Sequence, residues 1–178
     1  SPMDYTPGIF NLKEYRYNSH DDRTINTNHQ IPSTISKELA LYVIIYAPIQ
    51  MAADLPQNYE GHPAFQFILD VPTDWDKSIA INGEIGEYIT MARKDVNSDD
   101  WYLGSITNEK GRSMTVSFSF LEPNKSYNAT IYKDPGGGGW LKSPEEVVIE
   151  NMVVDYTTLY EMNLPEGGGQ AIKFTPVK

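Results

Sequence analysis

The pattern of hydrophobic residues changes at Trp75, and this change constrains the fold more than any other feature of the 178-residue sequence. Before Trp75, apolar residues recur at helical spacing in two short stretches. After it, they alternate with polar residues in short runs. Glycine follows the same division, because 2 of the 13 glycines lie in residues 1–75 and the other 11 lie in residues 76–178. We therefore predict an α+β chain in two parts, 1–75 and 76–178.

The first part predicts two helices. One is expected from Ser33, a candidate N-cap, to a helix-ending Pro48, on the apolar spacing of Ile35, Leu39, Tyr42, Val43 and Tyr46. Its run Leu39–Ala47 is too short to cross a membrane, and it is apolar all round. We expect protein outside this chain to cover it. A second short helix is expected from Pro63 to before Pro72, whereas residues 1–32 show no period.

The second part predicts antiparallel strands. Residues 113–120 alternate strictly between polar and apolar, which is typical of a half-buried strand. Turn signals such as Asn82-Gly83 separate the other runs. Further short strands are expected at about 78–82, 86–93, 101–107, 127–133, 146–150, 158–164 and 170–175, with the glycine clusters at 136–139 and 167–169 as loops. This spacing predicts a small antiparallel sandwich or a partly open barrel.

Composition excludes several classes of function. The formal net charge is −10 and no basic cluster is present, which argues against binding to nucleic acid. The chain has no cysteine, so disulfides, thiolate zinc sites and cysteine nucleophiles are all excluded. The residues from Ser1 to Asp4 lack the basic and apolar regions of a secretory signal peptide.

The isolated histidines, acidic pairs and glycine run do not predict a metal-binding or phosphate-binding site. The histidines His20, His29 and His62 lack the spacing of a helical zinc pair, and solvated histidines are the simpler interpretation. The acidic pairs Asp21-Asp22 and Asp99-Asp100 could offer oxygen ligands to calcium, but charged turns are commoner. We interpret Gly136–Gly139 as a flexible loop, since it lacks the lysine and spacing of a phosphate-binding loop.

Aromatic residues offer one further candidate site. Trp140 lies in a glycine-rich stretch and could stack on a sugar ring, whereas Trp101 lies in an alternating strand and is expected in the core. The triplet Asn128-Ala129-Thr130 fits a glycosylation sequon but falls in an expected strand, so we assign it no function.

An ordered series of motifs resembles glycoside hydrolase family 97. It begins with Met3-Asp4-Tyr5-Thr6-Pro7-Gly8-Ile9-Phe10 and covers nearly the whole chain. The other segments that carry the resemblance are Glu38–Pro56, Pro63–Ile68, Val71–Asp76, Gly86–Ile89, Ala92–Arg93, Asp99–Gly104, Ile106–Glu109, Ala129–Tyr132 and Gly167–Ile172.

The resemblance implies a three-part enzyme that cleaves α-glucosidic or α-galactosidic bonds. Its parts would be an N-terminal β-sandwich, a catalytic (β/α)8 barrel and a C-terminal antiparallel β-domain. On this mapping, residues 1–75 are the incomplete C-terminal end of the barrel and residues 76–178 are the β-domain. The resemblance also implies calcium near the active site, with ligands outside this chain, and a periplasmic or secreted enzyme of Bacteroidetes.

The segment from Asp4 to Asn11 would be the loop after the last barrel strand, which faces the substrate in such barrels. The resemblance therefore implies that Asp4, Tyr5 and Asn11 line the substrate site. Some inverting members have a glutamate general acid at the position of Asn11, and an amide cannot take that role. This departure favours a retaining, α-galactosidase-like subgroup or a different acid upstream.

The catalytic residues are accordingly expected upstream of Ser1, so we predict that this chain alone is inactive. Its expected partners are the rest of the barrel, the N-terminal β-domain, the oligosaccharide substrate of the whole enzyme and further copies of itself. An alternative is a non-catalytic carbohydrate-binding or oligomerisation module, with Trp140 as the sugar contact. A third is one piece of a nicked enzyme.

Overall fold

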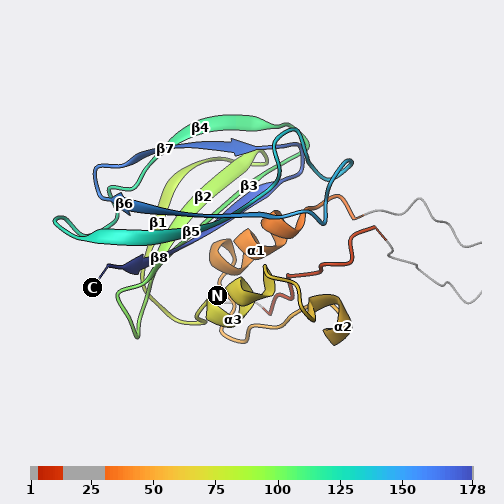
Figure 1. Cartoon of the computed structure of the whole chain (residues 1–178), viewed down its shortest axis with the longest axis horizontal. Coiled ribbons are helices and arrows are strands. Elements are labelled where there is room, and N and C mark those ends of the chain that lie inside the picture. The colour runs from red at the N-terminus through yellow and green to blue at the C-terminus, as the bar shows by residue number, and fades with distance from the viewer. Residues whose placement is uncertain (1–3, 14–30, 178) are drawn as a thin grey trace, which may run out of the picture.

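The computed structural model describes residues 4–13 and 31–177, which form a mainly antiparallel β-structure with three short helices (Figure 1). The helices are α1 (Ile35–Ile44), α2 (Pro56–Tyr59) and α3 (Phe65–Asp70). The strands are β1 (Trp75–Glu84), β2 (Tyr88–Asp95), β3 (Trp101–Thr107), β4 (Arg112–Ser117), β5 (Ser126–Lys133), β6 (Val148–Asp155), β7 (Leu159–Leu164) and β8 (Gly169–Pro176).

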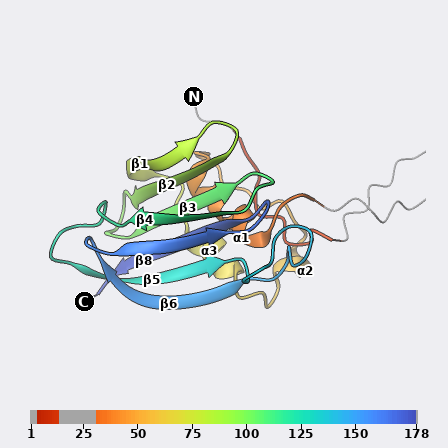
Figure 2. The ribbon, with the colours of Figure 1, turned by 90° about the horizontal axis from the view of Figure 1, so that it is seen from above.

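These elements form three layers. The middle layer is a six-stranded sheet with the order β1-β2-β3-β8-β5-β6, in which every neighbouring pair is antiparallel. The two-stranded sheet β4-β7 lies over one face of it, and the helices lie against the other face (Figure 1). Seen from above, β1 and β6 form the two outer edges of the large sheet (Figure 2).

Two hydrophobic cores separate the layers. The core between the two sheets contains Trp101, Tyr127 and Phe174 of the large sheet, together with Phe118, which directly follows β4. The core between the large sheet and the helices contains, among others, Leu39, Tyr42, Phe67, Tyr102, Tyr132 and Ala171. The second core therefore joins the helices before Trp75 to the strands after it.

Helix α1 is covered within this chain, so the expectation that it needs a partner from outside is wrong. Eight of its ten residues are buried, with Leu39 and Ala40 fully so. Gly104 lets β3 approach the helix closely, because a side-chain carbon there would meet the carbonyl oxygen of Ala40 at 2.5 Å. The apolar run that begins at Leu39 is covered by the sheet on one side and by other segments of the same chain on the others.

The helix ends also differ from the prediction. Thr34 is the N-cap, and its hydroxyl accepts a hydrogen bond from the Lys37 amide at 3.1 Å. Ser33 instead donates to the Glu38 carboxylate at 2.6 Å. The helix ends at Ile44, before Pro48.

The antiparallel part of the fold prediction is confirmed, and all eight expected strands are present. β6 runs over Val148–Asp155 rather than 146–150, and helix α2 was not predicted. Residues 4–13 contain no helix or strand, while 14–30 lie outside the described residues. The assignment of residues 1–75 to the end of a (β/α)8 barrel, and the domain boundary at 75, remain predictions.

Candidate functional site

The irregular segment 4–13 is held in place by carboxylates from three other parts of the chain. The first is Glu38 on helix α1, which is only 8% exposed. One of its oxygens accepts a hydrogen bond from the Gly8 amide at 3.0 Å, and the other accepts from the Ser33 hydroxyl. Both oxygens of this buried acid are therefore engaged.

The second carboxylate is Asp54, in the segment between α1 and α2. One of its oxygens accepts from the amides of Phe10 and Asn11, at 2.8 and 2.7 Å. The other accepts from the amide of Leu55 and the side chain of Asn58. Burial acts to raise the pKa of Asp54, but these four hydrogen bonds outweigh it and hold that pKa below its ordinary value.

The third carboxylate is Glu145, in the loop before β6. One of its oxygens accepts from the amides of Leu12 and Lys13, at 2.9 and 2.8 Å. Glu38, Asp54 and Glu145 thus all accept backbone hydrogen bonds from segment 8–13. Each is used to fix the path of the chain, and a carboxylate with a lowered pKa, such as Asp54, is a poor general acid at neutral pH.

Two tyrosines hold the same segment through its carbonyl groups. The Tyr42 hydroxyl lies within hydrogen-bond distance of the carbonyls of Pro7 (3.1 Å) and Met51 (2.9 Å). The Tyr59 hydroxyl donates to the Gly8 carbonyl at 2.8 Å. Burial, with smaller contributions from Tyr59 and Glu38, raises the pKa of Tyr42 well above its usual value, so this phenol stays a neutral donor.

The structure does not bring the three predicted substrate-lining residues together. Asp4 is exposed, and Tyr5 is half-buried with its pKa raised by burial and then by the charge of Glu38. Asn11 instead lines a shallow hollow of about 330 Å³ that contains neither Asp4 nor Tyr5. Its other lining residues are Phe10, Lys13, Ile35, Asn58, His62 and Glu145. The substrate-lining role of these three residues remains a prediction.

His62 is half-buried and lines the same hollow as Asn11, so its interpretation as a solvated histidine is wrong. Its ring lies edge-on to Phe10, with centroids 4.8 Å apart, and its Nδ1 accepts from the Ala64 amide. Burial lowers the pKa of His62, so the imidazole is neutral at pH 7. No local sequence signal could have found this contact, because Phe10 and His62 are brought together only by the fold.

Asp134 at the end of β5 is a buried acid that sequence reasoning missed. It is 5% exposed and accepts a hydrogen bond from the Gly169 amide at 3.0 Å. Burial raises its pKa to about 6, although the Gly169 amide, the hydroxyls of Thr34 and Ser36 and the charge of Lys37 act in the opposite direction. Asp134 therefore ties the start of β8 to the start of α1.

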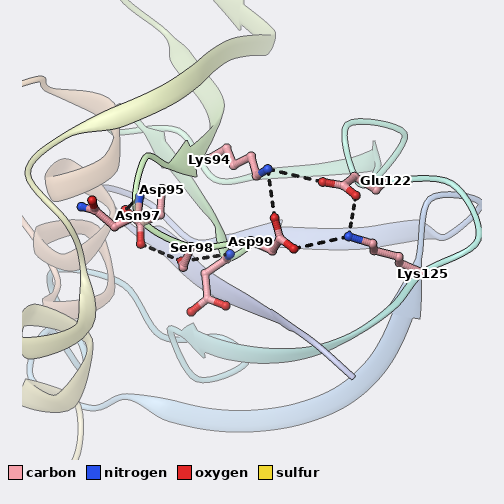
Figure 3. Close-up of polar contacts among 8 residues, drawn as sticks. Lys94, Asp95, Asn97, Ser98, Asp99, Glu122 and Lys125 are labelled. Atoms are coloured by element: carbon pink, nitrogen blue, oxygen red, sulfur yellow. Dashed lines mark hydrogen bonds and ion pairs between the residues drawn. The ribbon is translucent and has the colours of Figure 1, made fainter. Parts of the chain in front are cut away.

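The acidic pair Asp99-Asp100 does not fit a calcium site. Asp99 pairs with Lys94 at 3.2 Å and Lys125 at 3.4 Å, and both lysines also pair with Glu122, which closes a ring of alternating charge (Figure 3). Asp100 lies 3.7 Å from the ammonium of Lys173. Within residues 4–13 and 31–177, no three His, Cys, Asp or Glu side chains are grouped to hold a metal. Asp21 and Asp22, like His20 and His29, lie outside the described residues.

The remaining candidates are placed as follows. Trp101 is in the core as predicted, at 2% exposure. Trp140 is half-buried, and its ring lies against the backbone of Gly167. Asn128 is exposed on β5. None of the helices in the described part of the chain is long and apolar enough to cross a membrane.

Comparison with known protein families identifies the family of this chain. A family model described as "Glycosyl-hydrolase 97 C-terminal, oligomerisation" matches residues 74–175, more than half of the chain. The chain belongs to this glycoside hydrolase 97 family. The resemblance inferred from its motifs is confirmed.

The relatives match nearly the whole chain and not only its strands. A retaining α-galactosidase of Bacteroides thetaiotaomicron is 36% identical over 174 residues, covering 97% of this chain and 25% of the relative. A family 97 enzyme from Pseudoalteromonas sp. strain K8, solved with acarbose, is 43% identical with a TM-score of 0.88, covering 100% of this chain and 27% of that one. The chain thus spans about a quarter of the length of these relatives.

A β-arabinopyranosidase structure shares the fold alone, at 22% identity and a TM-score of 0.72, covering 97% of this chain and 25% of that one.

Proposed function

We propose that this chain is the non-catalytic C-terminal part of a family 97 enzyme that hydrolyses α-glycosidic bonds. The observation that carries the proposal is how the alignments are distributed. At least 97% of this chain aligns with each of two much longer relatives, but it covers only about a quarter of the length of each. The use of its acids supports the same conclusion. Glu38, Asp54 and Glu145 lie around the segment predicted to face the sugar, and each accepts backbone hydrogen bonds.

The two carboxylates of such a hydrolase would then come from outside this chain. In the proposal, the chain supplies segment 4–13 to the rim of the site, a layer of helices behind it, and the β-sheets. Calcium near the active site and a periplasmic or secreted location are also proposed, on the family resemblance alone.

The substrate is proposed at the level of the α-glycosidic bond. One relative is named a retaining α-galactosidase and another was solved with acarbose, so relatives differ in what their names and ligands indicate. Asn11, which cannot act as a general acid, favours the retaining α-galactosidase-like alternative.

An assay of this chain on aryl α-glucosides and aryl α-galactosides tests the proposal, with the Bacteroides thetaiotaomicron relative as the positive control. We expect a rate for this chain equal to that of buffer. Turnover well above buffer, retained after a second purification step, would show that the chain carries its own catalytic groups and would overturn the proposal.

We further propose that the β-sheets assemble copies of the enzyme, and the family description "oligomerisation" favours this role. Sugar binding through Trp140 has less support, because one side of its ring is occupied by Gly167. Affinity electrophoresis on α-glucans, with wild type compared with Trp140→Ala, tests that alternative: retardation of the wild type alone would favour it.

A further inference from the structure

The six-stranded sheet has two open edges, β1 and β6, at which backbone groups can pair with another chain (Figure 2). Natural sheets protect such edges with bulges, lysines, prolines or short strands. The two edges of this sheet differ in how far they are protected.

The β1 edge carries two protective features. Its pairing with β2 shifts register twice, between Trp75 and Lys77 and between Ala80 and Asn82. Such irregularities twist and interrupt an edge strand, and Lys77 adds a charge that resists pairing. We therefore do not expect β1 to add a further strand.

The β6 edge lacks bulges, lysines and prolines; its charged residues are Glu150, which pairs with Lys133 at 2.7 Å, and Asp155. Its eight residues pair with β5 without a register shift, and they include no proline, glycine or lysine. Residues 150–153 are all exposed, and they include Met152 at 39% and Val153 at 66%. Tyr156, in the turn after β6, and Leu159, the first residue of β7, are 41% and 68% exposed. Among the described residues, the backbone of 148–154 is paired with β5 alone.

We propose that β6 pairs antiparallel with β6 of a second copy of this chain, about a two-fold axis. The inference rests on the proposed role in oligomerisation and names the surface that performs it. An antiparallel pair of identical strands is self-complementary, which is what a two-fold interface requires. Pairing would continue one sheet across both copies and bury the exposed apolar side chains on each side of the edge.

Charge excludes one register of this pairing. A two-fold axis perpendicular to the sheet sets one residue opposite its own copy. An axis at Glu150 would place two carboxylates opposite each other, which is destabilising. An axis at Met152 pairs two thioethers instead, and it sets Glu150 opposite Val154 and Asp155 opposite Ile149. We propose the register centred on Met152, which places an apolar side chain at the axis and separates the carboxylates.

Single-cysteine cross-linking tests the register directly, because the chain has no cysteine of its own. We expect Met152→Cys to form a disulfide-linked dimer under mild oxidation. Ile85→Cys is the matched control: Ile85 is fully exposed at the β1–β2 turn, next to the other edge, and should stay monomeric on the same denaturing gel.

Sedimentation equilibrium measures the dissociation constant of the dimer, and a second pair of variants is compared with the wild type. Met152→Lys would place two ammonium groups opposite each other at the axis, so the dissociation constant should rise about tenfold or more. Ile85→Lys should leave it unchanged. Thermal melts by circular dichroism identify a variant that fails to fold, and in that event the cysteine experiment decides.

The outcomes separate this inference from the proposed function. A wild-type dimer that cross-links through Cys at 152 and weakens with Met152→Lys supports the β6 interface. A wild-type dimer that does neither overturns the β6 interface and leaves the oligomerisation role in place. A wild-type chain that stays monomeric at every concentration overturns both.

Discussion

The backbone amide of Asn11 donates to the Asp54 carboxylate at 2.7 Å, and so joins two segments that are 43 residues apart in the sequence. Asn11 is the residue at which a family resemblance would place a catalytic acid. In this chain, its backbone is fixed by an acid from elsewhere. The relationship makes Asp54 one support of the irregular segment, and this leads to a first prediction.

Asp54→Asn should destabilise the chain by about 1–3 kcal/mol, because the partly buried amides of Phe10 and Asn11 would lose a charged acceptor. Urea denaturation measures this, and Glu60→Gln, at an exposed acid, is the control. The pKa of Asp54 is lowered by folding, so its contribution is present above pH 4 and is lost as the pH falls through the folded pKa. Equal stabilities for the two variants would contradict the support role.

Gly8→Ala should cost more stability than Gly86→Ala. Both glycines have positive φ angles, of 89° and 79°, so both substitutions strain the backbone by about 1–2 kcal/mol. At Gly8 the added carbon would also overlap the Tyr42 hydroxyl, whereas at Gly86 nothing lies within 4 Å. We expect the difference between the two melting temperatures to report this overlap. A Gly8→Ala variant as stable as Gly86→Ala would show that Tyr42 moves aside freely.

Asp134→Asn should flatten the dependence of stability on pH. The pKa of Asp134 is raised from 3.8 to about 6, so the folded chain binds this proton more tightly than the unfolded chain does. Wild-type stability should therefore fall as the pH rises from about 4 to about 6. At pH 7, the variant should be more stable by up to about 3 kcal/mol, since each pKa unit corresponds to about 1.4 kcal/mol.

Chemical denaturation of both proteins at pH 4, 5, 6 and 7 measures this difference. Asp76→Asn, at an exposed acid, should leave the wild-type pH profile unchanged. If wild type and Asp134→Asn had parallel profiles, Asp134 would not be the group that titrates.

Millimolar calcium should leave the melting temperature of this chain unchanged. The oxygens of Asp99 are paired with Lys94 and Lys125, so a cation would have to displace two ammonium groups. Sodium chloride of matched ionic strength is the control, because salt alone screens this exposed ring of charges. A rise in melting temperature specific to calcium would contradict the assignment of Asp99 to the ring.

Strict alternation predicted the outer strand β4, of which only Val116 is fully buried. The central strands β3 and β8 are buried on both faces, and they were predictable only as short runs bounded by turn signals. The prediction was poorest at β6, and the structure gives the reason. Its central residues 150–153 are all exposed, so the contrast between a buried and a solvated face is missing there. The exposure of residues 150–153 explains why the predicted strand ended at 150, and the same exposure makes β6 a candidate interface.

The environment of α1 and the site acids could not be predicted in the same way. The composition of α1 correctly indicated burial on more than one side, but its cover comes from β3 and β8, which lie far along the sequence. In the sequence, nothing distinguishes Glu38 and Glu145 from solvated acids. Only the fold places the amides of Gly8 and Leu12 within hydrogen-bond distance of them. Asp4, Tyr5 and Asn11 are grouped by the family resemblance, and their role in lining a substrate site remains a prediction.

The core shared by α1, α3 and the large sheet has a consequence for how such proteins evolve. Tyr102 and Tyr132 lie in strands, yet Phe67 of α3 packs edge-on against both rings, with centroids 6.0 and 5.3 Å away. A recombination event at residue 74, where the family match begins, would leave these aromatic faces in water. We therefore expect the strands to be inherited together with the helices that cover them, so that an exchange of the β-sheets would also carry the end of the helical layer.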